Sequence, residues 1–129
     1  MVSVYALILK DFVLPTENPN DELILYLEIN DDDPNNELIS QLNNKLKGRV
    51  KIFPFSKSTV DANGAVICHL KDKTALNVSF SIAELQINNQ IKVNMGYYWG
   101  RSAAGSDTYI LKKKNGIFQI IERIEDYRM

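Results

Sequence analysis

The sequence predicts an α+β protein, in which a curved antiparallel β-sheet meander packs against two helices. Apolar residues recur at helical spacing in two segments of the N-terminal part. After Gly48 the spacing changes from about 3.6 to about 2 residues, and turn residues then separate several extended segments. The chain has 129 residues, of which 45% are hydrophobic, so we expect a single α+β domain over residues 1–129.

The first helix is predicted from the stripe Tyr5, Ile8, Leu9 and Phe12, whose spacing places four apolar side chains on one face. Pro15 and the polar residues after it end this helix. The apolar run Leu23–Ile29 has seven residues, a length typical of a buried strand rather than a helix.

The second helix is predicted over residues 34–47. Asp33 is expected to cap its N-terminus, and Pro34 suits the first helical position. Its buried stripe is Leu38, Ile39, Leu42 and Leu46. Gly48 can adopt the left-handed conformation that ends a helix.

Short strands are expected next. The segment Val50–Phe53 is extended, and Pro54 confines it to an edge or an end of the sheet. A second short strand, Ala65–Leu70, is entered through the turn Asn63-Gly64.

Two long strands follow, joined at Asn88-Asn89. Apolar residues alternate cleanly from Leu76 to Ile82, but the phase then slips by one residue, which predicts a β-bulge near Ala83-Glu84. Five apolar residues alternate strictly from Ile91 to Trp99, and this is the clearest strand in the sequence.

The C-terminal part is predicted to complete the meander. Arg101–Ser106 is rich in small residues and is expected to be a loop. The strand Thr108–Lys114 then runs into Asn115-Gly116, a strong signal for a type I′ hairpin turn. The last strand is expected to span Ile117–Ile124 and to leave a short polar tail.

Composition excludes several classes of function. Fifteen basic and sixteen acidic residues give a net charge of −1, which excludes the strongly basic surface of a general nucleic-acid binder. One cysteine and one histidine exclude an intrachain disulfide and a zinc site built from those residue types. We therefore expect no nucleic acid and no cofactor.

The N-terminal sequence bears on location. Its longest apolar run, Tyr5–Leu9, is far shorter than the ~20 residues of a membrane-spanning helix, so we expect no membrane segment. The first residues lack the basic region and cleavage site of a signal peptide. A cytoplasmic location is favoured, and a mature secreted or periplasmic protein is the alternative.

Three motifs favour structural roles over chemistry. The acidic stretch Asn30–Glu37 lacks the glycine and the final glutamate of a calcium loop, so it is interpreted as a solvated loop before a helix. Cys68 and His69 are neighbours on a strand and therefore point to opposite faces, so Cys68 is expected in the core. The segment Gly100–Ser106 lacks a phosphate-binding lysine and a following helix. We expect no metal site and no catalytic residue.

The aromatic residues are the best candidates for a ligand site. Tyr97 and Trp99 share one face of their strand, and Tyr26 and Tyr109 are expected to line the same concave surface. Glu84, near the expected bulge, is the candidate inward carboxylate. Core packing is the first interpretation of these side chains and a ligand pocket is the second, because a buried phenol serves both.

A family resemblance joins these elements. The stretch from Lys92 to Tyr127 contains Gly96-Tyr97-Tyr98, Gly100, Ala103-Ala104-Gly105, Tyr109 and Lys113-Lys114-Asn115-Gly116-Ile117-Phe118. It resembles the C-terminal hairpins of NTF2-like and cystatin-like domains, and also the endings of small bacterial proteins of unassigned function. The resemblance implies a cone-shaped sheet that can enclose an apolar pocket. The strand predicted at Leu23–Ile29 departs from the NTF2-like pattern.

Two functions are carried forward from the sequence. The first is a soluble, non-catalytic protein-interaction domain, such as an inhibitor or toxin-neutralising (immunity) protein. The second is an NTF2-like domain that binds, isomerises or hydrolyses a small apolar molecule on the concave face around Tyr97 and Trp99. The expected partner is another protein in the first case. A homodimer is compatible with both.

Overall fold

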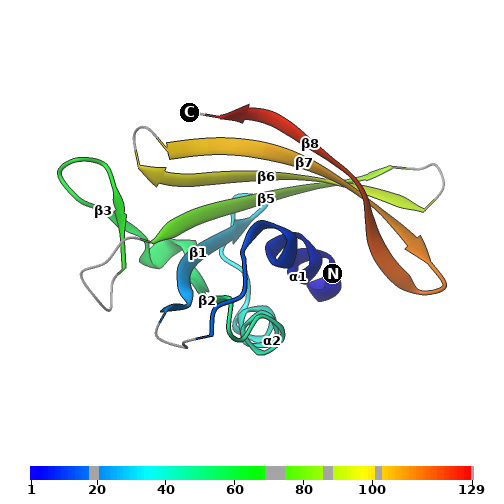
Figure 1. The fold of residues 1–129 in the computed structure, drawn as a ribbon, viewed down its shortest axis with the longest axis horizontal. Helices are drawn as coiled ribbons and strands as arrows, with labels where there is room; N and C mark the ends of the chain where they lie inside the picture. Colours follow the sequence, from blue (N-terminus) through cyan, green and yellow to red (C-terminus); the bar gives the residue numbers. More distant parts are fainter. Residues whose placement is uncertain (18–20, 69–74, 86–88, 101–102, 129) are drawn as a thin grey trace.

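The computed structural model describes residues 1–17, 21–68, 75–85, 89–100 and 103–128, without the side chains of Glu84 and Leu85. Its elements, in chain order, are α1 (Val2–Phe12), β1 (Leu23–Ile29), α2 (Asn36–Lys45), β2 (Val50–Pro54), the short 3₁₀ helix η2 (Phe55–Lys57), β3 (Thr59–Val60), β4 (Val66–Ile67), β5 (Leu76–Leu85), β6 (Gln90–Gly100), β7 (Ala103–Lys114) and β8 (Ile117–Arg128). Figure 1 shows a curved sheet above two helices. The fold is therefore α+β, as predicted.

The main sheet has six strands in the order β2-β1-β5-β6-β7-β8. The meander β5–β8 is antiparallel, as predicted. β1 is parallel to both of its neighbours, so the sheet is mostly antiparallel rather than antiparallel throughout. The physical reason is the connection between β1 and β2, because a chain that crosses over through a helix such as α2 returns parallel to the first strand.

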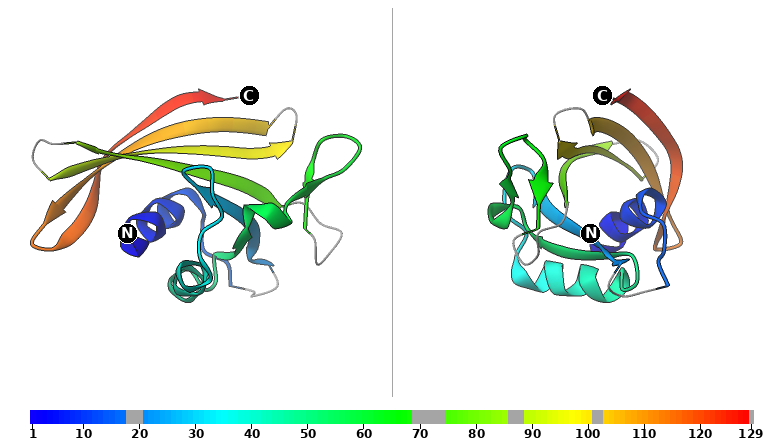
Figure 2. Two further views of the ribbon diagram at one scale, coloured as in Figure 1. Left: turned by 180° about the vertical axis from the view of Figure 1, so that it is seen from behind. Right: turned by 60° about the vertical axis from the view of Figure 1, so that its left-hand side comes forward.

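Both helices pack on the concave face of the sheet. Figure 2 shows the sheet curling around α1 without closing, and α2 lying below β1 and β2. The core between the helices and the sheet includes Ile8, Leu9, Leu25, Leu27, Leu42, Leu46, Ile52, Leu76, Val78, Phe80, Val93, Met95 and Leu111. Within the part of the chain that the structure describes, no helix is long and apolar enough to cross a membrane.

Both predicted helices are present, but α2 (Asn36–Lys45) is shorter at both ends than the predicted range 34–47. α1 contains the predicted stripe, and β1 has the predicted bounds. α2 begins later than expected, because Asn35 caps it by accepting a hydrogen bond from the Leu38 backbone N–H at 2.8 Å. The Asp33 carboxylate instead accepts from the Ser56 backbone N–H at 3.0 Å. Hydrogen bonds from Ser56, chiefly from its side chain and then from its backbone, lower the pKa of Asp33. Gly48 has the expected positive φ of 87°.

A second, smaller cluster lies on the opposite face of the sheet. β3 and β4 form a separate antiparallel pair beside it. The cluster contains Ile24, Tyr26, Val66, Cys68 and Ala75. Cys68 is therefore a buried core residue, as predicted. The expected strand Ala65–Leu70 is only two residues long in its described part, and His69 lies outside the described residues.

The predicted β-bulge near Ala83-Glu84 was wrong. β5 and β6 pair without a register shift from Asn77 opposite Tyr98 to Leu85 opposite Gln90. This end of the hairpin extends past the helices, as Figure 1 shows. The one-residue slip in the apolar pattern of the sequence therefore does not correspond to a slip in strand pairing. Asn89 has a positive φ of 54°, as a turn requires, whereas Asn88 lies outside the described residues.

The last two strands are longer than predicted. β7 already begins at Ala103, so most of the expected loop Arg101–Ser106 is strand. β8 continues to Arg128, so the expected polar tail after Ile124 is strand as well. The predicted turn at Asn115-Gly116 was confirmed, with φ values of 53° and 80°. The sheet register shifts in β7 and β8, between Ser106 and Asp107 and between Ile110 and Leu111.

Candidate functional site

Three of the predicted site residues lie on the concave face beside α1. Tyr109 is fully buried, and its hydroxyl donates a hydrogen bond to Asp11 Oδ2 at 3.0 Å. The Tyr97 ring is half-buried, with its centre 5.0 Å from that of Phe12. Trp99 is half-buried and packs against the main core. In this structure, α1 therefore packs against the concave surface on which these aromatic residues lie.

The other two predicted residues do not join this group. Tyr26 is fully buried in the cluster on the opposite face, with its ring centre 6.1 Å from that of Phe53. The side chain of Glu84 lies outside the described part of the structure. Ligand binding by Tyr97 and Trp99 stays a prediction.

A cluster of charged side chains on the concave face was missed by the sequence analysis. The Asp107 side chain is completely buried. Its Oδ2 accepts hydrogen bonds from Arg123 Nη2 at 2.8 Å and Arg123 Nε at 3.2 Å, and its Oδ1 accepts from Arg128 Nη1 at 2.6 Å. The signal was the alternation Asp107, Tyr109, Leu111, but the predicted strand began one residue after Asp107.

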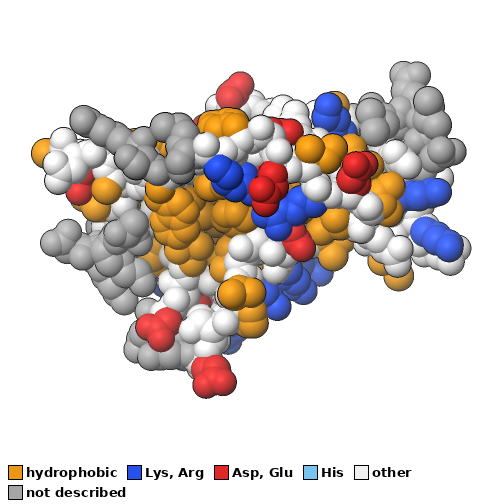
Figure 3. Space-filling model, turned by 45° about the horizontal axis from the view of Figure 1, so that its top comes forward, with side chains coloured by type: hydrophobic (Ala, Val, Ile, Leu, Met, Phe, Trp, Pro, Cys, Tyr) orange, Lys and Arg blue, Asp and Glu red, His pale blue; other side chains and the backbone are white. Residues whose placement is uncertain are grey.

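This cluster joins α1 to the C-terminal strands. Arg123 Nη1 donates to Asp11 Oδ2 at 2.9 Å, and Arg128 Nη2 lies 3.1 Å from Glu125 Oε1. The two guanidinium groups also lie over aromatic rings, Arg123 over Tyr109 at 5.4 Å and Arg128 over Tyr97 at 5.3 Å. Figure 3 shows basic and acidic side chains alternating in a row beside a group of hydrophobic side chains.

The surroundings of the cluster favour neutral phenols. Desolvation raises the pKa of Tyr109 well above its usual value of about 10, and the Asp11 carboxylate raises it further. Desolvation also raises the pKa of Tyr97. The carboxylate of Asp107 and both guanidinium groups are held by partners within the chain. The cluster therefore acts first as a clamp between α1, β7 and β8.

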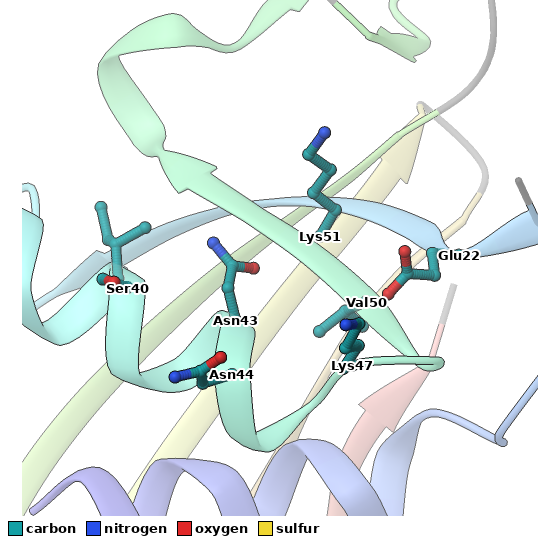
Figure 4. A pocket seen from close by; sticks show the side chains of 8 residues that line it. Glu22, Ser40, Asn43, Asn44, Lys47, Val50 and Lys51 are labelled. Carbon is teal, nitrogen blue, oxygen red and sulfur yellow. The ribbon is translucent and has the colours of Figure 1, made fainter. Parts of the chain in front are cut away.

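The largest hollow described here lies between α2 and β2, with a volume of about 550 Å³. Figure 4 shows Asn43 directed toward β2 and Glu22 close to the start of that strand. Asn43 Oδ1 accepts from the Ile52 N–H at 2.7 Å, and its Nδ2 donates to the Ile52 carbonyl at 3.1 Å. Glu22 accepts from the Gly48 N–H at 2.9 Å. These polar groups hold backbone in place rather than face a ligand.

A smaller hollow of about 260 Å³ lies between α1 and the hairpin that joins β7 to β8. Its floor contains Ala6, Leu7 and Phe118, and two lysines, Lys10 and Lys45, stand at its border. No polar side chain of the described residues has a buried atom without a hydrogen-bond partner, so this hollow offers no unpaired buried polar group to a ligand.

A third hollow, about 350 Å³ in volume, lies across strands β5 to β8 and is named here the outer groove. Phe55, Asn77, Ser79, Gly96, Tyr97, Tyr98, Ala104, Gly105 and Tyr127 line it. The hydroxyl of Tyr98, one of these lining residues, donates to the Gly64 carbonyl at 2.8 Å. The groove combines aromatic rings with amide and hydroxyl groups.

The two edges of the sheet differ. At β2, Asn43 occupies the backbone N–H and C=O of Ile52, and Pro54 lacks an N–H, so this edge is partly blocked. At the other end, β8 has no strand on its outer side within the described residues. β8 also exposes four large apolar side chains: Ile117 (67%), Ile121 (50%), Ile124 (43%) and Tyr127 (52%).

The described residues contain no group of three or more histidine, cysteine, aspartate or glutamate side chains that could hold a metal ion. Comparisons with protein-family models, curated proteins and solved structures found no match to this chain.

Proposed function

We propose that this chain is a non-catalytic protein-interaction domain that adds an extended segment of another protein to the free edge of β8. The observation that carries the proposal is the twelve-residue strand at the end of the sheet, with its four exposed apolar side chains. Backbone groups along a free edge supply affinity in this mode of recognition, and alternate side chains supply specificity.

The charges of β8 favour a basic partner. Glu122 and Asp126 are exposed along its C-terminal half, and Glu125 is exposed but pairs with Arg128 at 3.1 Å. The two arginines of the same segment, Arg123 and Arg128, pair with three carboxylates, those of Asp107, Asp11 and Glu125, so they do not offset the charges of Glu122 and Asp126. The incoming segment is therefore expected to alternate apolar residues with lysine or arginine.

The strand is held firmly enough to act as a template. β7 pairs with it along its length, and the clamp around Asp107 fixes its C-terminal half to the concave face. Little conformational entropy is then lost by the protein on binding, which favours affinity. This geometry serves an inhibitor or toxin-neutralising protein, whose task is to hold an extended segment of its target.

The NTF2-like or cystatin-like cone is kept as a proposal for the finer fold. The curved, unclosed sheet around α1 supports it. The parallel strand β1 between β2 and β5 is a departure from an all-antiparallel cone.

The proposal is tested with a synthetic ten-residue peptide that alternates valine and lysine, titrated into the isotope-labelled protein. We expect saturable NMR shifts of β8 amides and weaker binding at high salt, because exposed charges are screened. A matched peptide that alternates valine and glutamate should bind at least about tenfold more weakly.

Matched variants test whether the acidic residues of β8 attract the lysines of the peptide. Glu122→Lys should weaken the binding of the valine–lysine peptide, whereas Glu37→Lys on the exposed side of α2 should leave that binding unchanged. Equal binding of both peptides, or no shift in β8, would contradict the proposal. Self-association of the protein in sedimentation at the same concentrations would also contradict it, because a second copy would then occupy the edge.

A further inference from the structure

Gly96 forms part of the outer groove and has no evident structural reason to be glycine. It lies within β6, a central strand with neighbours on both sides. Its φ is not positive, unlike those of Gly48, Gly64 and Gly116. A Cβ built on Gly96 would meet no atom of the described chain within 4 Å.

Gly105 on the neighbouring strand makes a useful contrast. A Cβ there would overlap the Tyr97 hydroxyl and come within 2.8 Å of the Tyr127 carbonyl oxygen. Packing within the chain therefore requires glycine at position 105. It does not require glycine at position 96, where the missing side chain leaves open space.

A glycine inside a strand costs stability relative to alanine, and it often marks a place where another group approaches the backbone closely. At Gly96 that space is the floor of the outer groove, whose volume of about 350 Å³ is at the lower end of the range for small-molecule sites. The glycine is therefore explained by an occupant that lies on the sheet.

The lining defines the chemistry of that occupant. Aromatic rings surround the floor, with Tyr98 held by its hydrogen bond to Gly64, and Phe55 and Tyr127 also lining the groove. None of the nine lining residues is charged. An uncharged flat ring can stack in such a groove without losing the hydration of a charge.

The polar side chains apart from the tyrosine hydroxyls come from one strand, β5. Ser79 lies opposite Gly96, and Asn77 lies opposite Tyr98. Asn77 Oδ1 accepts from the Ser58 hydroxyl at 2.6 Å, which leaves its amide group to donate. Ser79 Oγ donates to Glu28 Oε1 at 2.6 Å, which leaves its oxygen to accept. Together they match one hydroxyl group, which both donates and accepts.

We propose that the outer groove binds a phenol: an uncharged aromatic ring that lies over Gly96, with its hydroxyl directed to Asn77 and Ser79. A sugar has hydroxyls around its whole rim and would need polar partners on every side, whereas the floor at Gly96, Ala104 and Gly105 carries no polar side chain. This site is separate from the free edge used in the proposed function, although Tyr127 borders both.

The test is an NMR titration of the isotope-labelled protein with p-cresol. Saturable shifts confined to amides around Gly96, Ser79 and Tyr98 are expected. Toluene, which lacks the hydroxyl, should bind about tenfold more weakly. Tighter binding of methyl glucoside than of p-cresol would overturn the proposal in favour of a sugar site. Shifts that spread over the sheet without saturation would overturn it as well.

A variant that fills the groove gives a second, independent result. Gly96→Val should retain or raise the melting temperature, because the space is open and valine suits a strand. The same substitution should weaken the binding of p-cresol at least about tenfold. Ala83→Val adds the same kind of side chain at an exposed position of β5 outside the lining, and it should leave p-cresol binding unchanged without lowering the melting temperature. A marked fall in the stability of Gly96→Val would show that glycine is needed for packing, and unchanged p-cresol binding by that variant would place the ligand elsewhere. Either result would overturn the proposal.

Discussion

At the scale of single residues, Asp107 is the one charged side chain that is buried among the described residues. A fully buried carboxylate is costly to remove from water unless charged donors surround it. Three hydrogen bonds from Arg123 and Arg128 meet this need, and the same arginines reach Asp11 and Glu125. The position of one carboxylate therefore decides how α1 and the end of β8 attach to the sheet.

Asp107→Asn should destabilise the protein by about 2 kcal/mol. This is less than the roughly 3–5 kcal/mol for breaking a fully buried pair, because both guanidinium groups keep about a third of their surface in water. Glu125→Gln is the control, since Glu125 is 67% exposed and pairs with the same arginine, and it should change stability by less than about 0.5 kcal/mol. Denaturant midpoints measure both, and equal effects of the two substitutions would show that burial of Asp107 is unimportant.

Two substitutions of Tyr97 distinguish the contribution of ring packing to stability from that of a hydrogen bond by its hydroxyl. Its ring contacts Phe12 and Arg128, and no hydrogen bond of its hydroxyl is recorded within the described residues. Tyr97→Phe should therefore change stability by less than about 0.5 kcal/mol, whereas Tyr97→Ala should cost roughly 2–3 kcal/mol, below the range for a fully buried aromatic residue. Thermal unfolding tests the pair, and a large loss in Tyr97→Phe would reveal a partner for the hydroxyl.

At the scale of elements, the sequence patterns predicted a strand or turn correctly where a single physical requirement determines the structure. The strict alternation of β6 and the Asn-Gly turn were predicted because burial of one face and positive φ each leave few alternatives. The start of α2 was predicted wrongly because Asp33 and Asn35 are both good caps, and only the contact of Asp33 with Ser56 decides between them. The bulge predicted in β5 was wrong because a slip in the apolar pattern of a sequence does not require a slip in strand pairing.

The β7–β8 turn gives a direct test at this scale. Gly116→Val should destabilise the protein by about 1 kcal/mol or more, because a β-branched residue resists the positive φ of 80°. Steric contact is not the cause, since a Cβ at Gly116 meets no atom within 4 Å. Gly116→Asn tolerates positive φ and should recover much of the loss. An unchanged denaturation midpoint in Gly116→Val would contradict the turn geometry.

At the scale of the whole molecule, the candidate site depends on contacts between distant parts of the chain. Arg123 meets Asp11 across 112 positions in the sequence, and Tyr109 meets the same carboxylate across 98. No local pattern encodes such a meeting. The sequence therefore predicted most strands of the sheet and both helices, but neither the charged clamp nor the position of Tyr26 on the opposite face. The free edge of β8 was missed because its C-terminal residues resemble a polar tail.

Alkaline titration tests the burial of several phenols at once. The folded pKa values of Tyr5, Tyr97 and Tyr109 are raised, chiefly by desolvation. Above a pH of about 10, the native state then holds more protons than the unfolded state, so stability should fall as pH rises. Below that pH the tyrosine contribution is fully present. Tyr109→Phe should make the fall shallower in denaturant midpoints measured between about pH 9 and pH 12, and an identical slope would contradict the raised pKa of Tyr109.

The most direct test of the interaction surface is paramagnetic broadening by the valine–lysine peptide carrying a nitroxide label at one end. If the peptide adds a strand to the free edge, amide signals of β8 should broaden most strongly, with weaker effects in β7 and none in β2 or α2. Moving the label to the other end of the peptide should move the broadening to the other end of β8. Broadening centred on β2, on the concave face, or spread evenly over the molecule would contradict the assignment of β8 as the interaction surface.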